Sequence, residues 1–364
     1  MTIYGSLFGG SPNDAVSRLI IPVVALGSET LPTPSPLVLD TGSAGMTINA
    51  QDVFPADMVS TNGFVFPPGQ NTLTYHGITV TNVQAKKVYG DGSHAEYGNI
   101  GFATVKFGGQ GELTTSLMPV LFSYKMLNRN GQLLQPPEHG IFGINSGANA
   151  VSASGTLSGD LNICSPQTIS ASGCHVVSVL RYLNYAPGVN AGFSLGNATL
   201  DPNCFVTPTM TGCTLQSTLT VGLSAADEQT YASTPLTCPP SKGPTGSDHG
   251  VMACDPDIFG GTISDSDSGE SFSVTELLLD SGTPTMNLSV PPTATFPQSL
   301  AAGSTETFTL PGSPLTFSYQ ANEDLPSLTI FTDYAKLQRT VIGIGFFIDH
   351  RMFIDLGSNR DGWK

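Results

Sequence analysis

The stretch Leu37–Ser43 reads Leu-Val-Leu-Asp-Thr-Gly-Ser, and a second stretch, Leu277–Thr283, reads Leu-Leu-Leu-Asp-Ser-Gly-Thr. In both copies a methionine follows the aspartate by six positions, and an aliphatic residue follows it by eight. A match of three residues would mean little. A pattern that covers twelve positions and occurs twice in one chain predicts a duplicated structural unit.

The residue types of the two stretches predict a paired acidic site. The three aliphatic residues before each aspartate indicate a buried strand that ends in a turn at Asp40 or Asp280. Gly42 and Gly282 let the backbone bend and be approached closely, and the neighbouring hydroxyls can hydrogen-bond a carboxylate. If the two turns face each other, the two carboxylates share one proton. Such a pair can activate a water and protonate an amide at the same time.

These motifs resemble those of the pepsin-like aspartic proteases, which carry an Asp-Thr/Ser-Gly motif in each of two lobes. Tyr89–Ser93, Tyr-Gly-Asp-Gly-Ser, is similar to the start of the family's flap, particularly in plant-type members. Ile141–Gly143 and Val341–Gly343 resemble the apolar-apolar-Gly elements that close each active-site loop. The segments Val176–Tyr185 and Val341–Trp363 resemble the helix before the crossover and the C-terminal stretch.

The resemblance implies an all-β, bilobal pepsin-like fold with a few short helices. It implies an N-terminal lobe over residues 1–190 and a C-terminal lobe over residues 191–364. The implied activity is that of an acid endopeptidase that needs no metal or cofactor, with Asp40 and Asp280 as the catalytic pair. The implied substrate-binding residues are Tyr89, Gly90, Asp91 and Gly92 in the flap, and Gly42, Ser43, Gly282 and Thr283 beside the pair.

Two features depart from the family pattern. The family usually has a tryptophan seven positions after the first aspartate, where it supports the flap tyrosine, but this chain has Thr47 there. The single tryptophan is Trp363, so the sequence leaves the anchoring of the flap open. The two aspartates are also 240 positions apart, which predicts extra loops between them.

The composition favours a β-rich protein with many turns. Of 364 residues only 11% are charged, whereas 41 are glycine and 27 are proline. The net charge of −15 predicts repulsion from nucleic acids and anionic membranes. It suits either an acidic milieu or simply an exported soluble protein. We therefore expect a monomer that acts on polypeptides, without nucleic acid or membrane partners.

The six cysteines indicate disulfide bonds rather than a metal site, because their number is even. Six cysteines allow 15 pairings, and the close spacings favour three local ones: Cys164–Cys174, Cys204–Cys213 and Cys238–Cys254. Disulfides imply an oxidising compartment, so we expect a secreted or periplasmic protein. The six histidines are scattered and lack metal-site spacing.

The composition of several other segments predicts loops, a helix and a turn. The prolines at 32–36 predict a loop, and the Ser/Gly-rich residues 147–171 and 237–268 predict a surface loop and a long stapled loop. The apolar spacing of Val176–Leu183 predicts a helix. Asp265–Asp267 resembles the start of a calcium loop, but the central glycine is displaced, which favours a solvated turn.

A second class of function also fits the resemblance. Some proteins with the pepsin fold are inhibitors or binding proteins without catalysis, and these usually lose one aspartate or a neighbouring hydroxyl. Here Asp40, Asp280 and the hydroxyl residues that follow them are all retained, so the enzyme interpretation is favoured.

Overall fold

The computed structural model describes residues 2–8, 16–88, 94–109, 111, 113–134, 140–154, 162–167, 169–170, 172–200, 214–235, 258–274, 276–283, 286–290, 295–296, 305–310, 316–320, 330–333 and 340–364. Strands dominate these residues, which confirms the all-β prediction. The helical segments among them are single turns: the 3-10 helices η1 (Ala50–Asp52) and η2 (Val179–Tyr182), and the α-helices α1 (Ala225–Glu228) and α2 (Phe346–Asp349). Within these residues, no helix has the length and apolar character needed to cross a bilayer.

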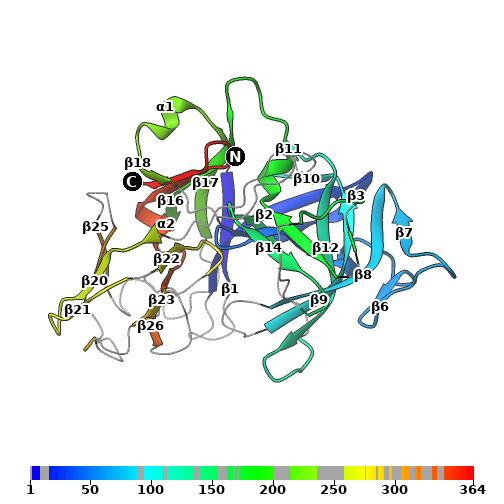
Figure 1. Ribbon diagram of the computed structural model, residues 1–364, viewed down its shortest axis with the longest axis horizontal. Helices are drawn as coiled ribbons and strands as arrows, with labels where there is room; N and C mark the ends of the chain where they lie inside the picture. Colours follow the sequence, from blue (N-terminus) through cyan, green and yellow to red (C-terminus); the bar gives the residue numbers. More distant parts are fainter. Residues whose placement is uncertain are drawn as a thin grey trace.

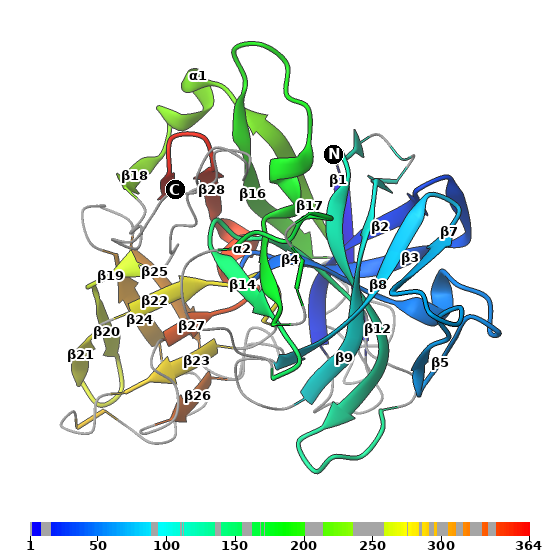
Figure 2. The same cartoon turned by 45° about the vertical axis from the view of Figure 1, so that its right-hand side comes forward.

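One continuous sheet runs through the molecule and joins its two halves (Figures 1 and 2). Strand β1 is the link, because it pairs with β2 of the N-terminal half on one side and with β17 on the other. The path begins with β18 (Ala232–Pro235), β29 (Arg360–Trp363), β28 (Arg351–Asp355), β16 (Asn190–Leu200), β17 (Thr214–Leu223) and β1 (Thr2–Phe8).

The same path continues through the N-terminal half as β2 (Val16–Leu26), β3 (Glu29–Asp40), β13 (Ile141–Ile144), β4 (Ala44–Asn49), β12 (Met118–Asn128), β9 (His94–Ala103), β8 (Ile78–Val88) and β7 (Thr72–Tyr75). The short strands β10 (Val105–Phe107) and β11 (Leu113–Thr114) branch from β2, and β5 (Val59–Ser60) pairs with β6 (Gly63–Phe64). Strands β8 and β9, which flank the flap sequence, pair as a hairpin, while residues 89–93 between them lie outside the described residues.

Two smaller sheets build the C-terminal half, on the left of Figure 1. One contains β19 (Ile258–Phe259), β22 (Glu276–Leu279), β27 (Thr340–Ile342), β23 (Met286–Ser289) and β26 (Ile330–Asp333). The other contains β21 (Ser271–Ser273), β20 (Thr262–Asp265), β24 (Thr305–Thr309) and β25 (Thr316–Gln320). The start of the C-terminal lobe at residue 191 stays a prediction, since β16 spans that position within the shared sheet.

The predicted duplication is present in the strand pairing. In the N-terminal half, β3 pairs in parallel with β13, which pairs antiparallel with β4. In the C-terminal half, β22 pairs in parallel with β27, which pairs antiparallel with β23. The aliphatic residues before each aspartate are buried, as the pattern predicts. Leu37, Leu39, Leu277 and Leu279 belong to a hydrophobic cluster that extends from Leu19 to Trp363 and contains residues of both halves.

The predicted loop at residues 32–36 is wrong, because these prolines lie within β3. Proline cannot donate a ladder hydrogen bond and is tolerated where a strand lacks a second neighbour or is bulged. Over this stretch β3 pairs with β2, while its pairing with β13 begins only at Val38. The register between β2 and β3 also shifts between Val23 and Ala25, opposite the proline-rich stretch.

Three other expectations need correction. The predicted helix at Val176–Leu183 consists of the end of strand β15 (Cys174–Val177) followed by the four residues of η2. The predicted surface loop at 147–171 contains strand β14 (Ala148–Val151), which pairs with β15. The predicted stapled loop at 237–268 contains β19 and β20. In each case pairing with a distant segment overrides a local composition typical of loops or helices.

The Cys164–Cys174 disulfide is confirmed, with the two Cα atoms 5.0 Å apart. It ties the segment after β14 to the start of β15. The other two predicted pairs, Cys204–Cys213 and Cys238–Cys254, lie outside the described residues.

The predicted solvated turn is present, since Ser266–Gly269 are exposed, but Asp265 at its start is buried. Asp265 is 3% exposed and accepts hydrogen bonds from the backbone N–H and the hydroxyl of Ser268. It lies opposite the buried Glu306 in the pairing of β20 with β24. Among the described residues, no group of three or more His, Cys, Asp or Glu side chains is arranged to hold a metal ion.

A further aspartate turn ends β28. Asp355 is fully buried and accepts the N–H groups of Gly357 at 2.7 Å and Ser358 at 2.9 Å, and the Ser358 hydroxyl at 2.6 Å. The Asn190 side chain donates to it at 2.9 Å. Glu228 of α1 also hydrogen-bonds it, and burial together with Asp355 raises the pKa of Glu228. This turn fastens the C-terminal hairpin to β16 and α1.

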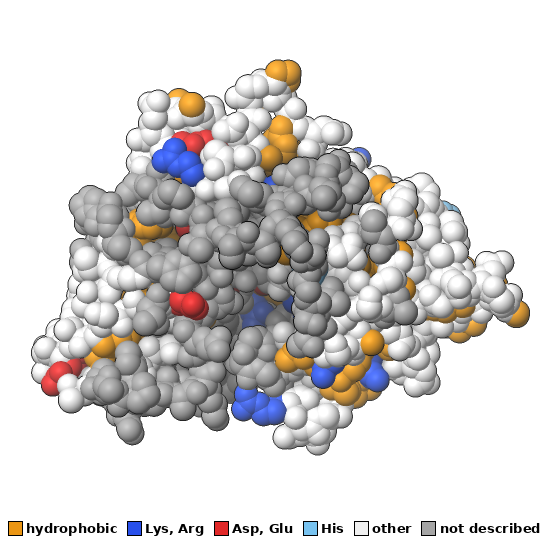
Figure 3. Space-filling view, viewed as in Figure 1, with side chains coloured by type: hydrophobic (Ala, Val, Ile, Leu, Met, Phe, Trp, Pro, Cys, Tyr) orange, Lys and Arg blue, Asp and Glu red, His pale blue; other side chains and the backbone are white. Residues whose placement is uncertain are grey.

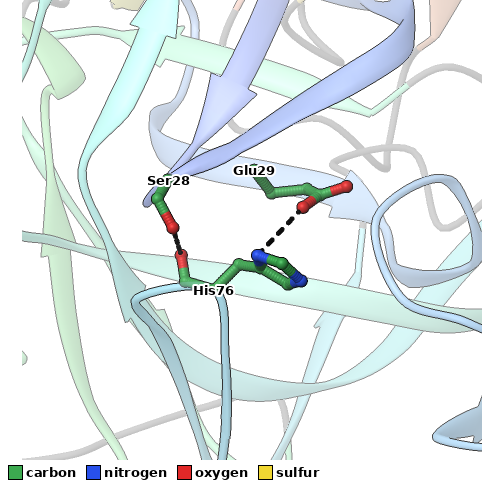
Figure 4. A network of polar contacts seen from close by, with 3 residues as sticks. All are labelled: Ser28, Glu29 and His76. Atoms are coloured by element: carbon green, nitrogen blue, oxygen red, sulfur yellow. Dashed lines mark hydrogen bonds and ion pairs between the residues drawn. The ribbon is translucent and has the colours of Figure 1, made fainter.

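Two hairpin turns in the N-terminal half are held together by polar contacts (Figure 4). The Ser28 N–H and hydroxyl donate to the His76 carbonyl at 2.7 and 2.9 Å, and His76 Nδ1 lies 3.3 Å from a Glu29 carboxylate oxygen. Gly27 adopts a φ of +58°, and a Cβ at this position would lie 2.3 Å from the His76 carbonyl oxygen. Only glycine therefore fits here.

We expect Gly27→Ala to destabilise the protein by about 2 kcal/mol or more, because it adds a steric clash to the cost of a positive φ. Denaturant unfolding measures the change. Gly69→Ala is the matched control, since Gly69 has a φ of +74° with no atom within 4 Å of an added Cβ. Equal losses of stability in the two variants would show that the clash of an added Cβ with the His76 carbonyl has no energetic cost.

Candidate active site

Asp40 lies at the end of β3, in a turn that surrounds its carboxylate with donors. Oδ1 accepts the N–H groups of Gly42 at 2.7 Å and Ser43 at 3.1 Å, and Oδ2 accepts the Ser43 hydroxyl at 2.5 Å. The side chain is 7% exposed. These bonds hold the carboxylate in one orientation. The structure therefore places Gly42 and Ser43 beside Asp40, as predicted.

Asp280 follows β22 in the corresponding turn of the other half. Its Oδ1 accepts the Gly282 N–H at 2.8 Å, and its Oδ2 accepts the Thr283 hydroxyl at 2.6 Å. Its own N–H donates to the Ile342 carbonyl, so the strand β27 fixes where the turn begins. The predicted residues Gly282 and Thr283 thus occupy the positions that Gly42 and Ser43 have around Asp40.

Thr41 and Ser281 join the two turns through four crossed hydrogen bonds. The Thr41 hydroxyl donates to the Leu279 carbonyl at 2.8 Å and accepts the Ser281 N–H at 2.9 Å. In return, the Ser281 hydroxyl donates to the Leu39 carbonyl at 2.8 Å and accepts the Thr41 N–H at 3.2 Å. Both side chains are fully buried. Each hydroxyl therefore satisfies backbone groups of the opposite half that have no water nearby.

The crossed bonds bring the two carboxylates close together. A Cβ on Gly42 would lie 2.5 Å from Cγ of Asp280, and a Cβ on Gly282 would lie 2.7 Å from Cγ of Asp40. Each glycine thus faces the aspartate of the opposite turn, and a side chain at either position would occupy the space of that carboxylate. The same Cβ on Gly282 would lie 2.8 Å from Oδ1 of Asp40 and 3.1 Å from Oδ1 of Asp280, so the two carboxylates border one space.

The environment of Asp280 favours its protonated form. Burial, the charge of Asp40 and the hydrogen bond to Asp40 raise the pKa of Asp280 to about 7. Hydrogen bonds from Thr283 and Gly282 oppose this shift without cancelling it. At acidic pH the arrangement therefore has both a proton donor and a hydrogen-bonded carboxylate acceptor within one site.

Thr47, at the position of the family tryptophan, has a structural role in this chain. Its hydroxyl accepts the Ile141 N–H at 2.9 Å, which ties β4 to the start of β13. It also lies 3.5 Å from Oε1 of the buried Glu96, on the second strand of the flap hairpin. The predicted flap residues Tyr89, Gly90, Asp91 and Gly92 lie outside the described residues, so their placement over the site stays a prediction.

Two asparagines support the Asp40 turn and were not anticipated from the sequence. The Asn145 side chain donates to the Thr41 carbonyl at 3.0 Å. The Asn149 side chain accepts the Ala44 N–H at 2.7 Å. Asparagine in a Ser/Gly-rich segment is the usual composition of a loop, so no local signal marks either residue. The sequence did contain a signal for the crossed hydrogen bonds of Thr41 and Ser281, since both motifs place a hydroxyl residue directly after the aspartate.

We expect Thr41→Val to lower the free energy of unfolding by about 1–3 kcal/mol, because it leaves the buried Leu279 carbonyl and Ser281 N–H without partners. Valine keeps the shape of threonine, so packing changes little. The exposed Thr74 on β7 provides a control, and Thr74→Val should change stability by less than about 0.5 kcal/mol. Equal stability of Thr41→Val and the parent protein would contradict the role assigned to the crossed bonds.

No protein-family model and no curated protein matches this chain. Among solved structures, the chain is similar to an aspartic proteinase from Irpex lacteus, with a TM-score of 0.55 and 14% sequence identity. The similarity covers 100% of this chain and 96% of that chain. At this level of identity it establishes the fold and not the activity. The chain therefore has the all-β, bilobal fold of the pepsin-like aspartic proteases.

Proposed function

We propose that the protein is an aspartic endopeptidase that hydrolyses peptide bonds in acid, with Asp40 and Asp280 as its catalytic residues. The observation that carries the proposal is the close approach of two carboxyl groups that related turns hold in place. The fold shared with an aspartic proteinase supports it. We place the site between an N-terminal lobe over residues 1–190 and a C-terminal lobe over 191–364.

In this mechanism the pair holds one proton and one negative charge. The raised pKa of Asp280 assigns it the proton, while Asp40 is the acceptor. A water between the two carboxyl groups attacks the peptide carbonyl carbon as Asp40 takes its proton, and Asp280 gives its proton to the carbonyl oxygen. Asp40 then returns a proton to the amide nitrogen as the C–N bond breaks, and Asp280 regains its proton from the diol.

The residues around the pair have positioning roles in this proposal. Ser43 and Thr283 orient the carboxylates through their hydroxyls. Gly42 and Gly282 leave room for the opposite carboxylate and supply donors. Tyr89, Gly90, Asp91 and Gly92, at the tip of the β8–β9 hairpin, would close over a bound polypeptide.

The setting of the protein is also a proposal. The Cys164–Cys174 disulfide favours an oxidising compartment, hence secretion or a periplasmic location. The net charge of −15 disfavours nucleic acid and anionic membranes as partners. In Figure 3 few of the described side chains on this face are Lys, Arg, Asp or Glu. We propose that the protein acts as a monomer on polypeptides.

Asp40→Asn and Asp280→Asn should each lower the rate of peptide hydrolysis by about 10²–10⁴-fold while the protein stays folded. Asparagine is nearly isosteric with aspartate but cannot take or share the proton. The assay is cleavage of an acid-denatured protein, with products separated by mass. The exposed Asp57→Asn is the matched control and should keep the parent activity.

The parent activity should fall as the pH rises through about 7, because the pair then loses its shared proton. Near parental activity in either active-site variant would exclude the shared-proton mechanism. Absence of any cleavage by the folded parent protein across the acidic range would instead favour the binding or inhibitor function.

A further inference from the structure

One difference between the two half-sites is a buried side chain, that of Asn145. Asn145 follows β13 and is 5% exposed. Its amide group donates to the Thr41 carbonyl at 3.0 Å, and its side-chain oxygen accepts the Gly147 N–H at 2.5 Å. Its backbone N–H donates to the Ser43 carbonyl at 3.0 Å. The side chain is therefore held in one orientation, and its donor is aimed at the Asp40 turn.

The carbonyl that Asn145 binds belongs to the peptide group that also donates to Asp40. Thr41 C=O and Gly42 N–H are the two ends of one planar peptide. The Gly42 N–H donates to Asp40 Oδ1 at 2.7 Å. Hydrogen bonds in a chain polarise one another, so a donor on the carbonyl strengthens the N–H as a donor at the other end. A hydrogen-bond chain of this kind favours negative charge on the acceptor at its end.

The other half-site has no amide side chain at the equivalent position. Gly143 lies opposite Asp40 in the β3–β13 pairing. In the second half Ile342 lies opposite Leu279, and Gly343 follows it. The Asn145 N–H donates to the Ser43 carbonyl, and in the second half the Ile344 N–H donates to the corresponding Thr283 carbonyl at 2.9 Å. Ile344 and the following Gly345 have no polar side chain, so neither can polarise the peptide that donates to Asp280.

We propose that Asn145 is a positioning residue that makes the carboxyl pair asymmetric, so that Asp40 carries the negative charge and Asp280 carries the shared proton. The inference rests on the proposed function for its effect on catalysis, but the asymmetry itself is a property of the folded protein. Asp40 is the charged group that acts on Asp280. The other groups that bond the two carboxylates are the uncharged donors of Gly42, Ser43, Gly282 and Thr283.

The test compares Asn145→Ala with Asn149→Ala. Asn149 is the matched control because it supports the same turn from the same segment, but it binds the Ala44 N–H rather than the peptide that donates to Asp40. If Asn145→Ala fails to fold, Asn145→Leu provides an apolar side chain of similar shape.

Asn145→Ala should lower kcat by about tenfold with KM changed by less than about twofold. Without the polarised donor the charged pair binds its second proton more readily. The acidic limb of the pH–kcat profile should therefore move to higher pH by about half to one unit. Asn149→Ala should leave the position of this limb unchanged, even if it lowers stability.

A second readout does not depend on activity. Carbon-13 NMR of the aspartate carboxyl groups follows the titration of the pair, with Asp40→Asn and Asp280→Asn as assignment spectra. The order in which Asp40 and Asp280 take up protons should change in Asn145→Ala and not in Asn149→Ala. An unmoved acidic limb and titration in Asn145→Ala, or equal shifts in both variants, would overturn the inference. If the parent protein cleaves nothing, the proposed function fails, while the NMR comparison still decides the role of Asn145.

Discussion

The four hydrogen bonds that Thr41 and Ser281 make across the two halves are the constraint on which the rest of the site depends. Each hydroxyl binds a carbonyl of the opposite half and accepts an N–H from it. Because these groups are buried, the halves cannot separate or slide without leaving several polar groups unpaired. The position of the two carboxyl groups is therefore set by backbone contacts between residues distant in sequence. The strands deliver the aspartates, but the crossed bonds decide how closely they approach.

Close approach has an energetic cost that the surroundings offset. Two ionised carboxylates in this geometry would repel each other strongly, since burial reduces the screening by water. The donors around each carboxylate and the shared proton relieve the repulsion. The same features leave the pair dependent on the pH of the solution. A site of this construction is stable in its reactive form only while it retains one proton.

The sequence predicts those parts of the molecule that repeat or that have one dominant local preference. The two aspartate turns, their buried strands, the β8–β9 hairpin and the Cys164–Cys174 bridge follow from residue type and spacing. The prolines of β3 and the apolar residues of Val176–Leu183 led to wrong predictions. Their conformation depends on pairing with β2 and β14, and the local composition of these residues does not reveal that pairing. Asn145 could not be recognised for a related reason, because only the fold shows which peptide group it binds.

The turn that ends β28 has the same construction as the Asp40 turn of the candidate active site. Asp355 gathers two backbone donors and a serine hydroxyl just as Asp40 does, yet it serves only to fasten the C-terminal hairpin. In this position the motif only ends a strand. A single copy lacks the second carboxyl group that the proposed reaction needs. In the proposed function, reactivity arises only where two copies of the turn face each other. On that proposal, an ancestral chain with a single such turn would have gained a reaction by pairing with itself, with no new type of residue required.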